Sequence, residues 1–219
     1  MKKLVIFDLD GTLLNTIDDL AVSTNFALSC CGFPEHKVSQ YKYFVGNGIA
    51  KLFERALPEN ERNEQNIARM RMYFLEHYTV NNTCHTVPYD GIPDLLRSLA
   101  DQDVKLAVAS NKYQQGTEKL IDYYFGDIPF IAVLGQREGV PVKPDPVIIE
   151  EILGVAGISR DETLYTGDSG VDMQTAKNAG VESVGVTWGF RSKGELLENG
   201  ACHVVDYPGE LLKYMSERL

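Results

Sequence analysis

The sequence lacks any long hydrophobic run. None approaches the roughly 20 residues that a helix needs to cross a bilayer. Near the N-terminus an apolar run covers only residues 4–7, because Asp8 and Asp10 interrupt it, and no signal-peptide core follows. These absences predict a cytoplasmic protein with no membrane partner.

Positive charge is also scarce. The 219 residues include 21 Lys and Arg against 31 Asp and Glu, which gives a net charge of -10. Because no basic field is present to attract a phosphate backbone, we expect no nucleic-acid partner. If the substrate is an anion, local cations must overcome the overall repulsion, which directs attention to a metal site and to isolated lysines.

Cysteine is rare, and its spacing excludes familiar metal centres. The four residues, at positions 30, 31, 84 and 202, lack the spacing of metal ligands and suit reduced thiols. The chain length allows one large domain or two modest ones, and no internal repeat is present. The sequence leaves open whether the protein is a monomer or a homodimer.

Short apolar runs alternate with helical patterns along most of the chain. The runs have the composition of buried parallel strands and cover residues 4–7, 104–109, 130–134, 163–166, 183–187 and 203–205. Helical patterns lie between them, at residues 92–99, 117–124, 147–153, 171–179 and 211–215. This order predicts an α/β fold with a doubly wound, Rossmann-like parallel sheet covered by helices on both faces.

One stretch interrupts this alternation. Residues 16–82 contain helical patterns but no strand-like run, and the first helix is expected to stop at Gly32. An insert after the first strand lies over the edge where open α/β sheets bind ligands. We therefore predict an all-helical cap over residues 15–85, with the α/β core formed by 1–14 and 86–219.

The run Asp-Leu-Asp-Gly-Thr at residues 8–12 follows the first strand. By strand alternation, Asp8 and Asp10 are expected to aim the same way while Leu9 packs inward. Two close carboxylates indicate a metal site or an acid and base pair. Gly11 allows a sharp turn that brings amides toward an anion, so Gly11 and Thr12 are expected to bind phosphate.

Polar residues follow two further segments. Ser110 and Asn111 end the second strand, where a hydroxyl and an amide can hold a phosphoryl oxygen. Lys143 precedes Pro144, which keeps it extended and off the following helix, so that its ammonium can reach a cleft. We expect Asp145 to cap this helix, with a proline in the first position.

The run Gly-Asp-Ser-Gly-Val-Asp at residues 167–172 follows the fourth strand. Asp168 falls at the strand end, and Asp172 lies one helical turn onward on the same side. Oxygen ligands in this number suit Mg²⁺, which prefers one or two carboxylates with water and phosphate. The three strand-end clusters and Lys143 therefore predict a single site.

These motifs resemble those of the haloacid dehalogenase-like superfamily. Its signatures are Asp-x-Asp-Gly-Thr, a strand that ends in Ser or Thr, a Lys before a helix, and Gly-Asp-x-x-x-Asp, and all four occur here in order. The helical insert and the tracts at residues 45–48 and 185–191 are similar to the phosphoglycolate phosphatase-like branch. The likeness covers essentially the whole chain.

The resemblance implies a phosphatase that acts on a small phosphorylated metabolite, with phosphoglycolate as the natural guess. It implies that Asp8 attacks phosphorus and that Asp10 protonates the leaving group and then activates water. Further roles follow from the likeness: metal binding by Asp8, the backbone carbonyl of Asp10 and Asp168 with support from Asp172, phosphoryl binding by Ser110, Asn111 and Lys143, and specificity from Gly46, Asn47, Gly48 and Arg191.

Other functions share parts of this pattern. A dehalogenase or a phosphonate hydrolase does not need the acid at Asp10, whereas a sugar-phosphate mutase or a pyrophosphatase of the superfamily stays open. A receiver-like switch also binds Mg²⁺ and a phospho-aspartate, but needs neither the aspartate pair nor the helical insert. Such a switch would show no turnover of phosphate esters.

Overall fold

Six parallel strands form the central sheet of the structure, a computed structural model that describes residues 2–216. Across the sheet the order is β5 (Phe130–Gln136), β4 (Lys105–Tyr113), β1 (Leu4–Phe7), β6 (Thr163–Gly167), β7 (Glu182–Val186) and β8 (His203–Val205). Leu4 pairs with Lys105 on one side and Thr163 on the other, so β1 is an interior strand. Its four residues are all buried, as its continuous apolar run predicts.

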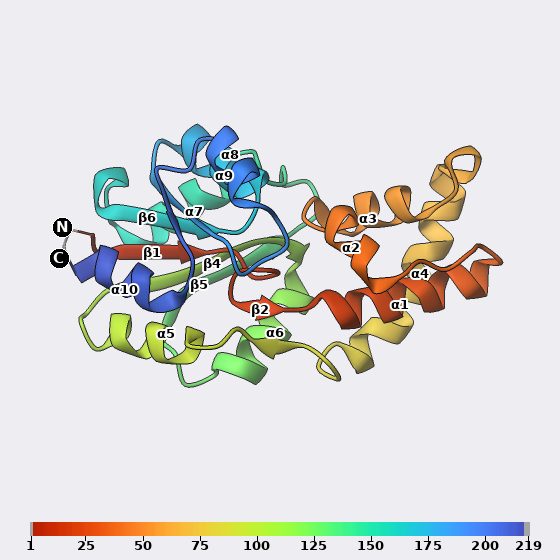
Figure 1. Ribbon diagram of the computed structural model, residues 1–219, viewed down its shortest axis with the longest axis horizontal. Helices are drawn as coiled ribbons and strands as arrows, with labels where there is room; N and C mark the ends of the chain where they lie inside the picture. Colours follow the sequence, from red (N-terminus) through yellow and green to blue (C-terminus); the bar gives the residue numbers. More distant parts are fainter. Residues whose placement is uncertain (1, 217–219) are drawn as a thin grey trace.

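Helices cover both faces of this sheet (Figure 1). Side chains of alternate residues in β1 enter different cores. Val5 and Phe7 pack with α5 (Ile92–Ala100), α6 (Gln114–Phe125) and α10 (Pro208–Ser216). Leu4 and Ile6 pack with α7 (Val147–Ala156) and α8 (Gly170–Ala179). The predicted doubly wound fold is confirmed.

Four helices form a separate lobe beside the sheet (Figure 1). They are α1 (Ile17–Cys31), α2 (Val38–Phe44), α3 (Gly48–Ala56) and α4 (Glu64–Asn81), with a 3-10 turn, η1, at Glu59–Glu61. Their apolar faces bury a core of their own, which includes Tyr41, Phe53 and Phe74. Gly32 ends α1 in the left-handed conformation, as predicted.

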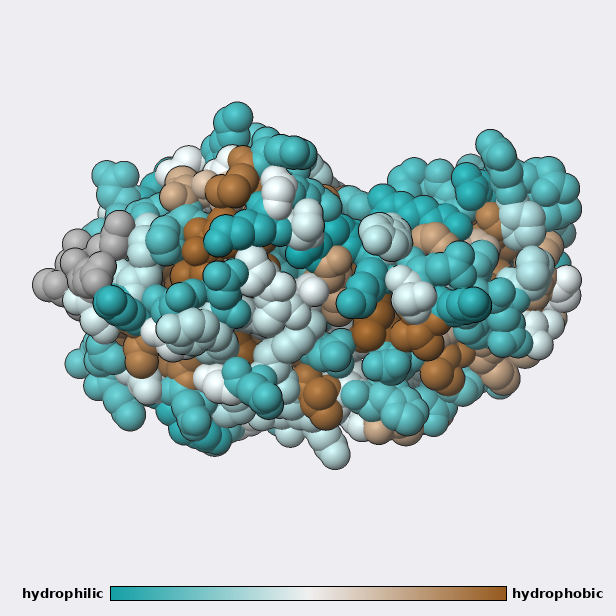
Figure 2. Space-filling model, in the orientation of Figure 1, coloured by the Kyte–Doolittle hydropathy of each residue, from teal (hydrophilic) through white to brown (hydrophobic). Residues whose placement is uncertain are grey.

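The two connections between lobe and core pair with each other. β2 (Leu14–Asn15) and β3 (Val87–Pro88) form an antiparallel ribbon that the sequence did not predict. Strands of two residues are too short to produce a recognisable alternation of side chains. In the space-filling view a notch separates the two lobes on one side (Figure 2).

Several element boundaries differ from the sequence prediction. β4 continues through Ser110 and Asn111 to Tyr113, because its register against β5 shifts after Ala109 and the extended backbone goes on past the irregularity. Helix α7 begins at Val147, with Pro146 at the capping position and the Asp145 carboxylate accepting from the Val147 amide. Two further short elements, α9 (Lys193–Glu198) and the 3-10 turn η2 (Arg160–Glu162), were not predicted.

The connectivity reverses at β1. The chain passes from β1 to β4 and β5 on one side of the sheet, then continues with β6 on the other. The carboxyl ends of β1, β4 and β6 therefore meet at a topological switch point, where open α/β sheets bind ligands. Within the described residues, no helix is both long and apolar enough to span a membrane.

Candidate active site

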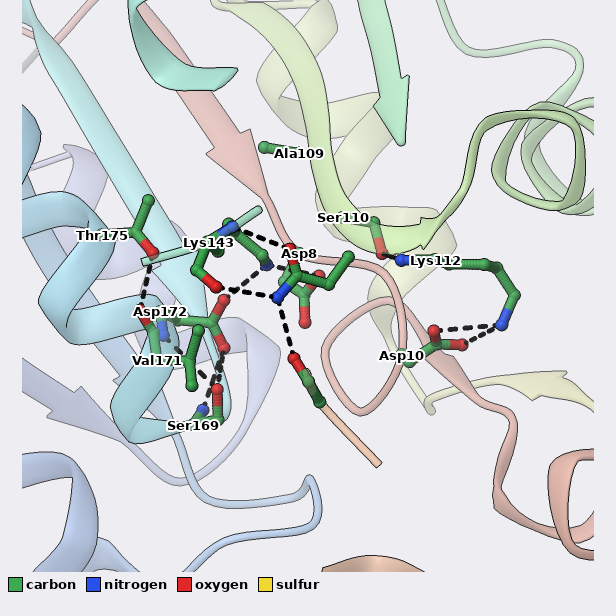
Figure 3. A network of polar contacts seen from close by, with 12 residues as sticks. Asp8, Asp10, Ala109, Ser110, Lys112, Lys143, Ser169, Val171, Asp172 and Thr175 are labelled. Atoms are coloured by element: carbon green, nitrogen blue, oxygen red, sulfur yellow. Dashed lines mark hydrogen bonds and ion pairs between the residues drawn. The ribbon is translucent and has the colours of Figure 1, made fainter. Parts of the chain in front are cut away.

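A buried lysine lies at the centre of the switch point (Figure 3). Lys143 is 2% exposed and comes from the connection between β5 and α7. Its Nζ donates to Asp8 Oδ1 at 2.9 Å, to Asp172 Oδ1 at 2.7 Å and to the Tyr165 hydroxyl at 2.9 Å. These acceptors use all three donors of the ammonium, so Lys143 holds the Asp8 carboxylate directly.

Three carboxylates gather around this lysine. Asp8, Asp168 and Asp172 each offer an oxygen, and the three oxygens lie within 4.8 Å of one another. Both Asp172 oxygens are engaged, one by Lys143 and the other by the amide and hydroxyl of Ser169. Asp8 and Asp168 each keep one oxygen that accepts no hydrogen bond from the described residues. A donor set made only of carboxylate oxygens, two of them open, fits Mg²⁺.

Burial and neighbouring charges shift the pKa values of Asp8, Asp168 and Lys143. Burial, opposed by the charge of Lys143 and aided by that of Asp172, raises the pKa of Asp8 from 3.8 to about 7. Burial and the charges of Asp172 and Asp8 raise the pKa of Asp168 well above its usual value. Burial lowers the pKa of Lys143, but the neighbouring carboxylates outweigh it and leave the pKa well above normal. A cation between Asp8 and Asp168 would relieve their repulsion.

Gly11 lets the first loop approach Asp168 closely. Its φ is 91°, and a Cβ at this position would lie 2.3 Å from Asp168 Oδ2. The backbone amides that were expected to bind phosphate form hydrogen bonds within the turn instead. The Gly11 amide donates to the Leu14 carbonyl, and the Thr12 amide donates to the Leu9 carbonyl. Glycine is therefore required here for packing against Asp168, while the Thr12 hydroxyl is buried with no hydrogen-bond partner among the described residues.

Asp8 and Asp10 do not aim the same way (Figure 3). β1 ends at Phe7, so strand alternation does not extend through the turn, although Leu9 packs inward as expected. The Asp10 carboxylate pairs with Lys112, which lies 2.8 and 3.0 Å from its two oxygens, and accepts from the Thr16 hydroxyl at 2.7 Å. The two aspartates therefore pair with different lysines, Asp8 with Lys143 and Asp10 with Lys112.

Ser110 and Asn111 have different surroundings. The Ser110 hydroxyl accepts from the Lys112 amide at 3.2 Å, which leaves its own proton available to a ligand. The Asn111 side-chain nitrogen donates to the carbonyls of Lys143 and Gly46, and its side-chain oxygen accepts from the Lys143 amide. Asn111 therefore fastens the Lys143 loop and the helical lobe to the end of β4.

A cavity of about 50 Å³ lies between this cluster and the helical lobe. Gly46 and Gly48 line it, as does Arg191, whose guanidinium donates to the carbonyls of Lys42 and Val45. Asn47 is absent from the lining and accepts instead from Arg55 at 2.7 Å. Three of the four expected specificity residues are thus brought to one cavity, together with Asp8, Asp10, Ser110 and Asp168.

Sequence reasoning missed three polar residues of this site. Lys112 follows Ser110 by two positions, so strand alternation offered a signal that both face one side. Tyr165 stands in an apolar strand, where its aromatic ring suggested only packing. Ser169 caps α8 by accepting from the Asp172 amide, and the spacing of serine and acid three residues apart is a recognisable capping box.

Comparison with known proteins identifies the family of the chain. The family model described as haloacid dehalogenase-like hydrolase matches residues 5–186. The chain belongs to this family. The resemblance drawn from the motifs is thereby confirmed.

Curated relatives in the family share most of their length with this chain. A phosphoglycolate phosphatase from Mesorhizobium japonicum is 31% identical over 221 residues, which cover 100% of this chain and 96% of that protein. A phosphoglycolate phosphatase from Pseudomonas putida is 33% identical over 198 residues, or 87% of this chain and 71% of that protein.

Solved structures share the fold across both lobes. A candidate phosphoglycolate phosphatase from Lactobacillus delbrueckii subsp. bulgaricus superposes with a TM-score of 0.91 at 33% identity, covering 98% of this chain and 99% of that one. A predicted phosphoglycolate phosphatase from Haemophilus somnus gives a TM-score of 0.89 at 27% identity, with 98% of each chain covered. The helical lobe is therefore part of the shared architecture.

Proposed function

We propose that this phosphatase hydrolyses a small phosphate monoester through a phospho-aspartate on Asp8. The observation that carries the proposal is the Asp8 carboxylate, which lines the cavity with one oxygen held by Lys143 and the other open. A nucleophile fixed in this way loses little orientational freedom when it attacks phosphorus. The phosphoglycolate phosphatase relatives support phosphoglycolate as the first substrate to test.

The proposed reaction has two steps. The open Asp8 oxygen forms a bond to phosphorus as the ester P–O bond breaks, and Asp10, which carries a proton when the ester arrives, delivers that proton to the departing alkoxide. Water then attacks phosphorus, Asp10 accepts its proton, and cleavage of the aspartyl–phosphate bond restores Asp8. Ser110 donates its hydroxyl proton to a phosphoryl oxygen, while Lys143 stabilises the Asp8 carboxylate when it is released.

Asp8 and Asp168, with the carbonyl of Asp10, are the groups we propose as Mg²⁺ ligands. When bound, this ion supplies positive charge that offsets the charge on the transferring phosphoryl group. We propose that Asp172 supports the site without binding the ion directly, because its two oxygens already accept hydrogen bonds from Lys143, Tyr165 and Ser169. It orients the lysine and the start of α8 beside Asp168.

We further propose that residues 15–85 form a cap and that 1–14 and 86–219 form the core. The four helices of this segment have their own hydrophobic core, and the β2–β3 ribbon joins them to the sheet. Hinging near residues 14–16 and 83–89 would open the cavity for substrate and close it against bulk water. A closed cap favours small esters over phosphoproteins.

Paired variants of the two aspartates test this mechanism. Asp8→Asn should abolish phosphate release, because an amide cannot form the phospho-enzyme. Asp10→Asn should lower turnover of alkyl phosphates by about 10²–10⁴-fold, the usual contribution of a general acid or base. The loss should be smaller for p-nitrophenyl phosphate, whose leaving group needs little protonation, and hydroxylamine-sensitive phosphate should accumulate on Asp8.

Phosphate release from a panel of small phosphoesters, measured with saturating Mg²⁺, provides the readout. Recovery of an isomerised sugar phosphate in place of inorganic phosphate would indicate a mutase instead. Equal losses for good and poor leaving groups, with no trapped phospho-enzyme in Asp10→Asn, would show that the role of Asp10 is wrong.

A further inference from the structure

A short loop of the core contacts both the acidic cluster and the helical lobe. This loop, residues 187–192, connects β7 to α9. The Phe190 amide donates to Asp168 Oδ2 at 2.7 Å, and the Phe190 side chain packs against the hydrophobic core of the lobe. The next residue, Arg191, donates to backbone carbonyls of the lobe. Two neighbouring residues thus connect a proposed metal ligand to the lobe.

The first half of the 187–192 loop is anchored to the core beside Asp168. A Cβ at Gly189 would lie 2.4 Å from Asp168 Oδ2 and 2.4 Å from the Gly11 carbonyl oxygen, so the backbone approaches both closely. Trp188 Nε1 donates to the Thr12 carbonyl at 3.0 Å. The amide that holds Asp168 therefore lies at the boundary between this anchored half and the half that reaches the lobe.

On the lobe side, the loop meets the end of a helix. The last carbonyls of an α-helix have no partner within the helix, and an arginine placed there can satisfy them. Arg191 donates to the carbonyl of Lys42, in the last turn of α2, and to that of Val45 at 2.9 Å. A residue of the core thus caps a helix of the lobe.

The Arg191 guanidinium is also held from the core. Its Nε lies 3.5 Å from Glu195 Oε1, and the same oxygen accepts from the Gly170 amide at 3.1 Å. Gly170 begins α8, two residues after Asp168. The Arg191 side chain is only 14% exposed, and hydrogen bonds from a charged donor are stronger than those from a neutral one. Arg191 therefore forms a strong contact between lobe and core.

We propose that Arg191 is a positioning residue that makes the orientation of Asp168 depend on the position of the helical lobe. With the lobe closed, Arg191 keeps the Phe190 amide on Asp168. When the lobe opens, its carbonyls leave the guanidinium, and the amide is free to move away from Asp168. The inference rests on the proposed function, in which Asp168 binds the metal and the lobe is a cap. It assigns Arg191 to this coupling.

Hydrogen exchange of single amides, followed by NMR, tests this coupling without any turnover. Arg191→Met should speed exchange of the Phe190 amide by about 10- to 100-fold, the range expected when charged hydrogen bonds are lost. The Val45 amide, which donates to the Tyr41 carbonyl at the end of α2, should also exchange faster. Arg191→Lys should restore part of the protection at both amides, because an ammonium can still donate to one carbonyl.

Arg55→Met is the matched control. Arg55 belongs to α3 of the lobe and donates to the Phe44 carbonyl at 2.9 Å, so it caps the same helix without contacting the loop. This variant should speed exchange at Val45 but leave Phe190 unchanged. Equal acceleration at Phe190 in the two arginine variants would show that this amide reports only a general loosening of the lobe, and the inference would be overturned.

The reverse direction provides a second test, because coupling between two sites is reciprocal. Asp168→Ala removes the acceptor of the Phe190 amide and should speed exchange at Val45, whereas Asp168→Asn keeps an acceptor and should have a smaller effect. In wild-type protein at low urea, the Phe190 and Val45 amides should share one opening free energy and one urea dependence. Different urea dependences would mean that loop and lobe open separately, which would contradict the coupling.

The outcomes separate this inference from the proposed function. Unchanged exchange at Phe190 in a folded Arg191→Met variant would overturn the coupling and leave the phosphatase mechanism intact. Failure of wild-type protein to release phosphate from any ester would overturn the mechanism. The exchange rates would still show whether the lobe and Asp168 are coupled.

Discussion

At the scale of single residues, Asp168 shows how a side chain is fixed while one oxygen stays open. Its Oδ2 accepts from the Phe190 amide at 2.7 Å, and Gly11 packs against it where no Cβ would fit. The other oxygen accepts no hydrogen bond from the described residues and lies with those of Asp8 and Asp172. The carboxylate is thus oriented before any ligand arrives.

Asp168→Asn should lower Mg²⁺ affinity by at least about 10-fold, because it keeps an acceptor for Phe190 but removes the charge. Titration calorimetry with Mg²⁺ measures the affinity, and activity at limiting Mg²⁺ should fall in parallel. Asp145→Asn is the control, since this carboxylate accepts from the Val147 amide at the start of α7. Unchanged binding in Asp168→Asn would remove Asp168 from the proposed ligands.

At the scale of elements, the two connections to the helical lobe are fastened to each other. Asp19, 2% exposed in the first turn of α1, accepts from the His85 and Thr86 amides at 3.0 and 2.8 Å and from the Thr86 hydroxyl at 2.8 Å. β2 and β3 pair just beyond this point. We therefore expect both connections to move together when the lobe moves.

Asp19→Ala should destabilise the protein by about 2–4 kcal/mol, because several buried donors lose their acceptor. Urea unfolding measures the loss, and hydrogen exchange should quicken at the amides of residues 85 and 86. Asp18→Ala is a matched control, since it removes the neighbouring acid from the same helical turn and carries the same helix-dipole cost. Similar effects in both variants would show that Asp19 does not hold the connections.

At the scale of the whole molecule, an acidic chain concentrates three carboxylates at one buried point. Without a cation, burial and its neighbours raise the Asp8 pKa from 3.8 to about 7. Between these values the folded protein binds more protons at Asp8 than the unfolded chain does. The Asp8 carboxyl therefore lowers the free energy of unfolding as pH rises through that window, and the full decrease is reached above it.

Mg²⁺ should consequently raise the melting temperature more at about pH 8 than at about pH 5.5, because at the lower pH the ion must displace a proton from Asp8. Thermal unfolding with and without Mg²⁺ across this range measures the effect. Asp8→Asn should remove the part of the pH dependence that comes from Asp8, while the part that comes from Asp168, whose pKa burial also raises, should remain. A Mg²⁺ effect that is the same at every pH in wild-type protein would contradict this coupling.

The sequence alone was sufficient to predict the parallel sheet and the helical insert. It was also sufficient to predict that Asp8, Ser110, Lys143 and Asp168 lie at one edge of the sheet. Apolar runs mark strands locally, and parallel strands joined by helices must end on the same edge of the sheet. Asp8, Ser110 and Asp168 directly follow predicted strands, and Lys143 lies on a loop beside them. Their convergence therefore needed no knowledge of individual side-chain contacts.

Only the tertiary structure decided how these side chains are paired. Asp10 meets Lys112 across 102 positions in the chain, and Asp8 meets Lys143 across 135. Side-chain direction beyond the end of β1 depends on the turn at Gly11 and on these distant partners, so strand alternation failed for Asp10. The pairing of Lys112 with Asp10 became visible only in the structure, where β1 and β4 lie side by side.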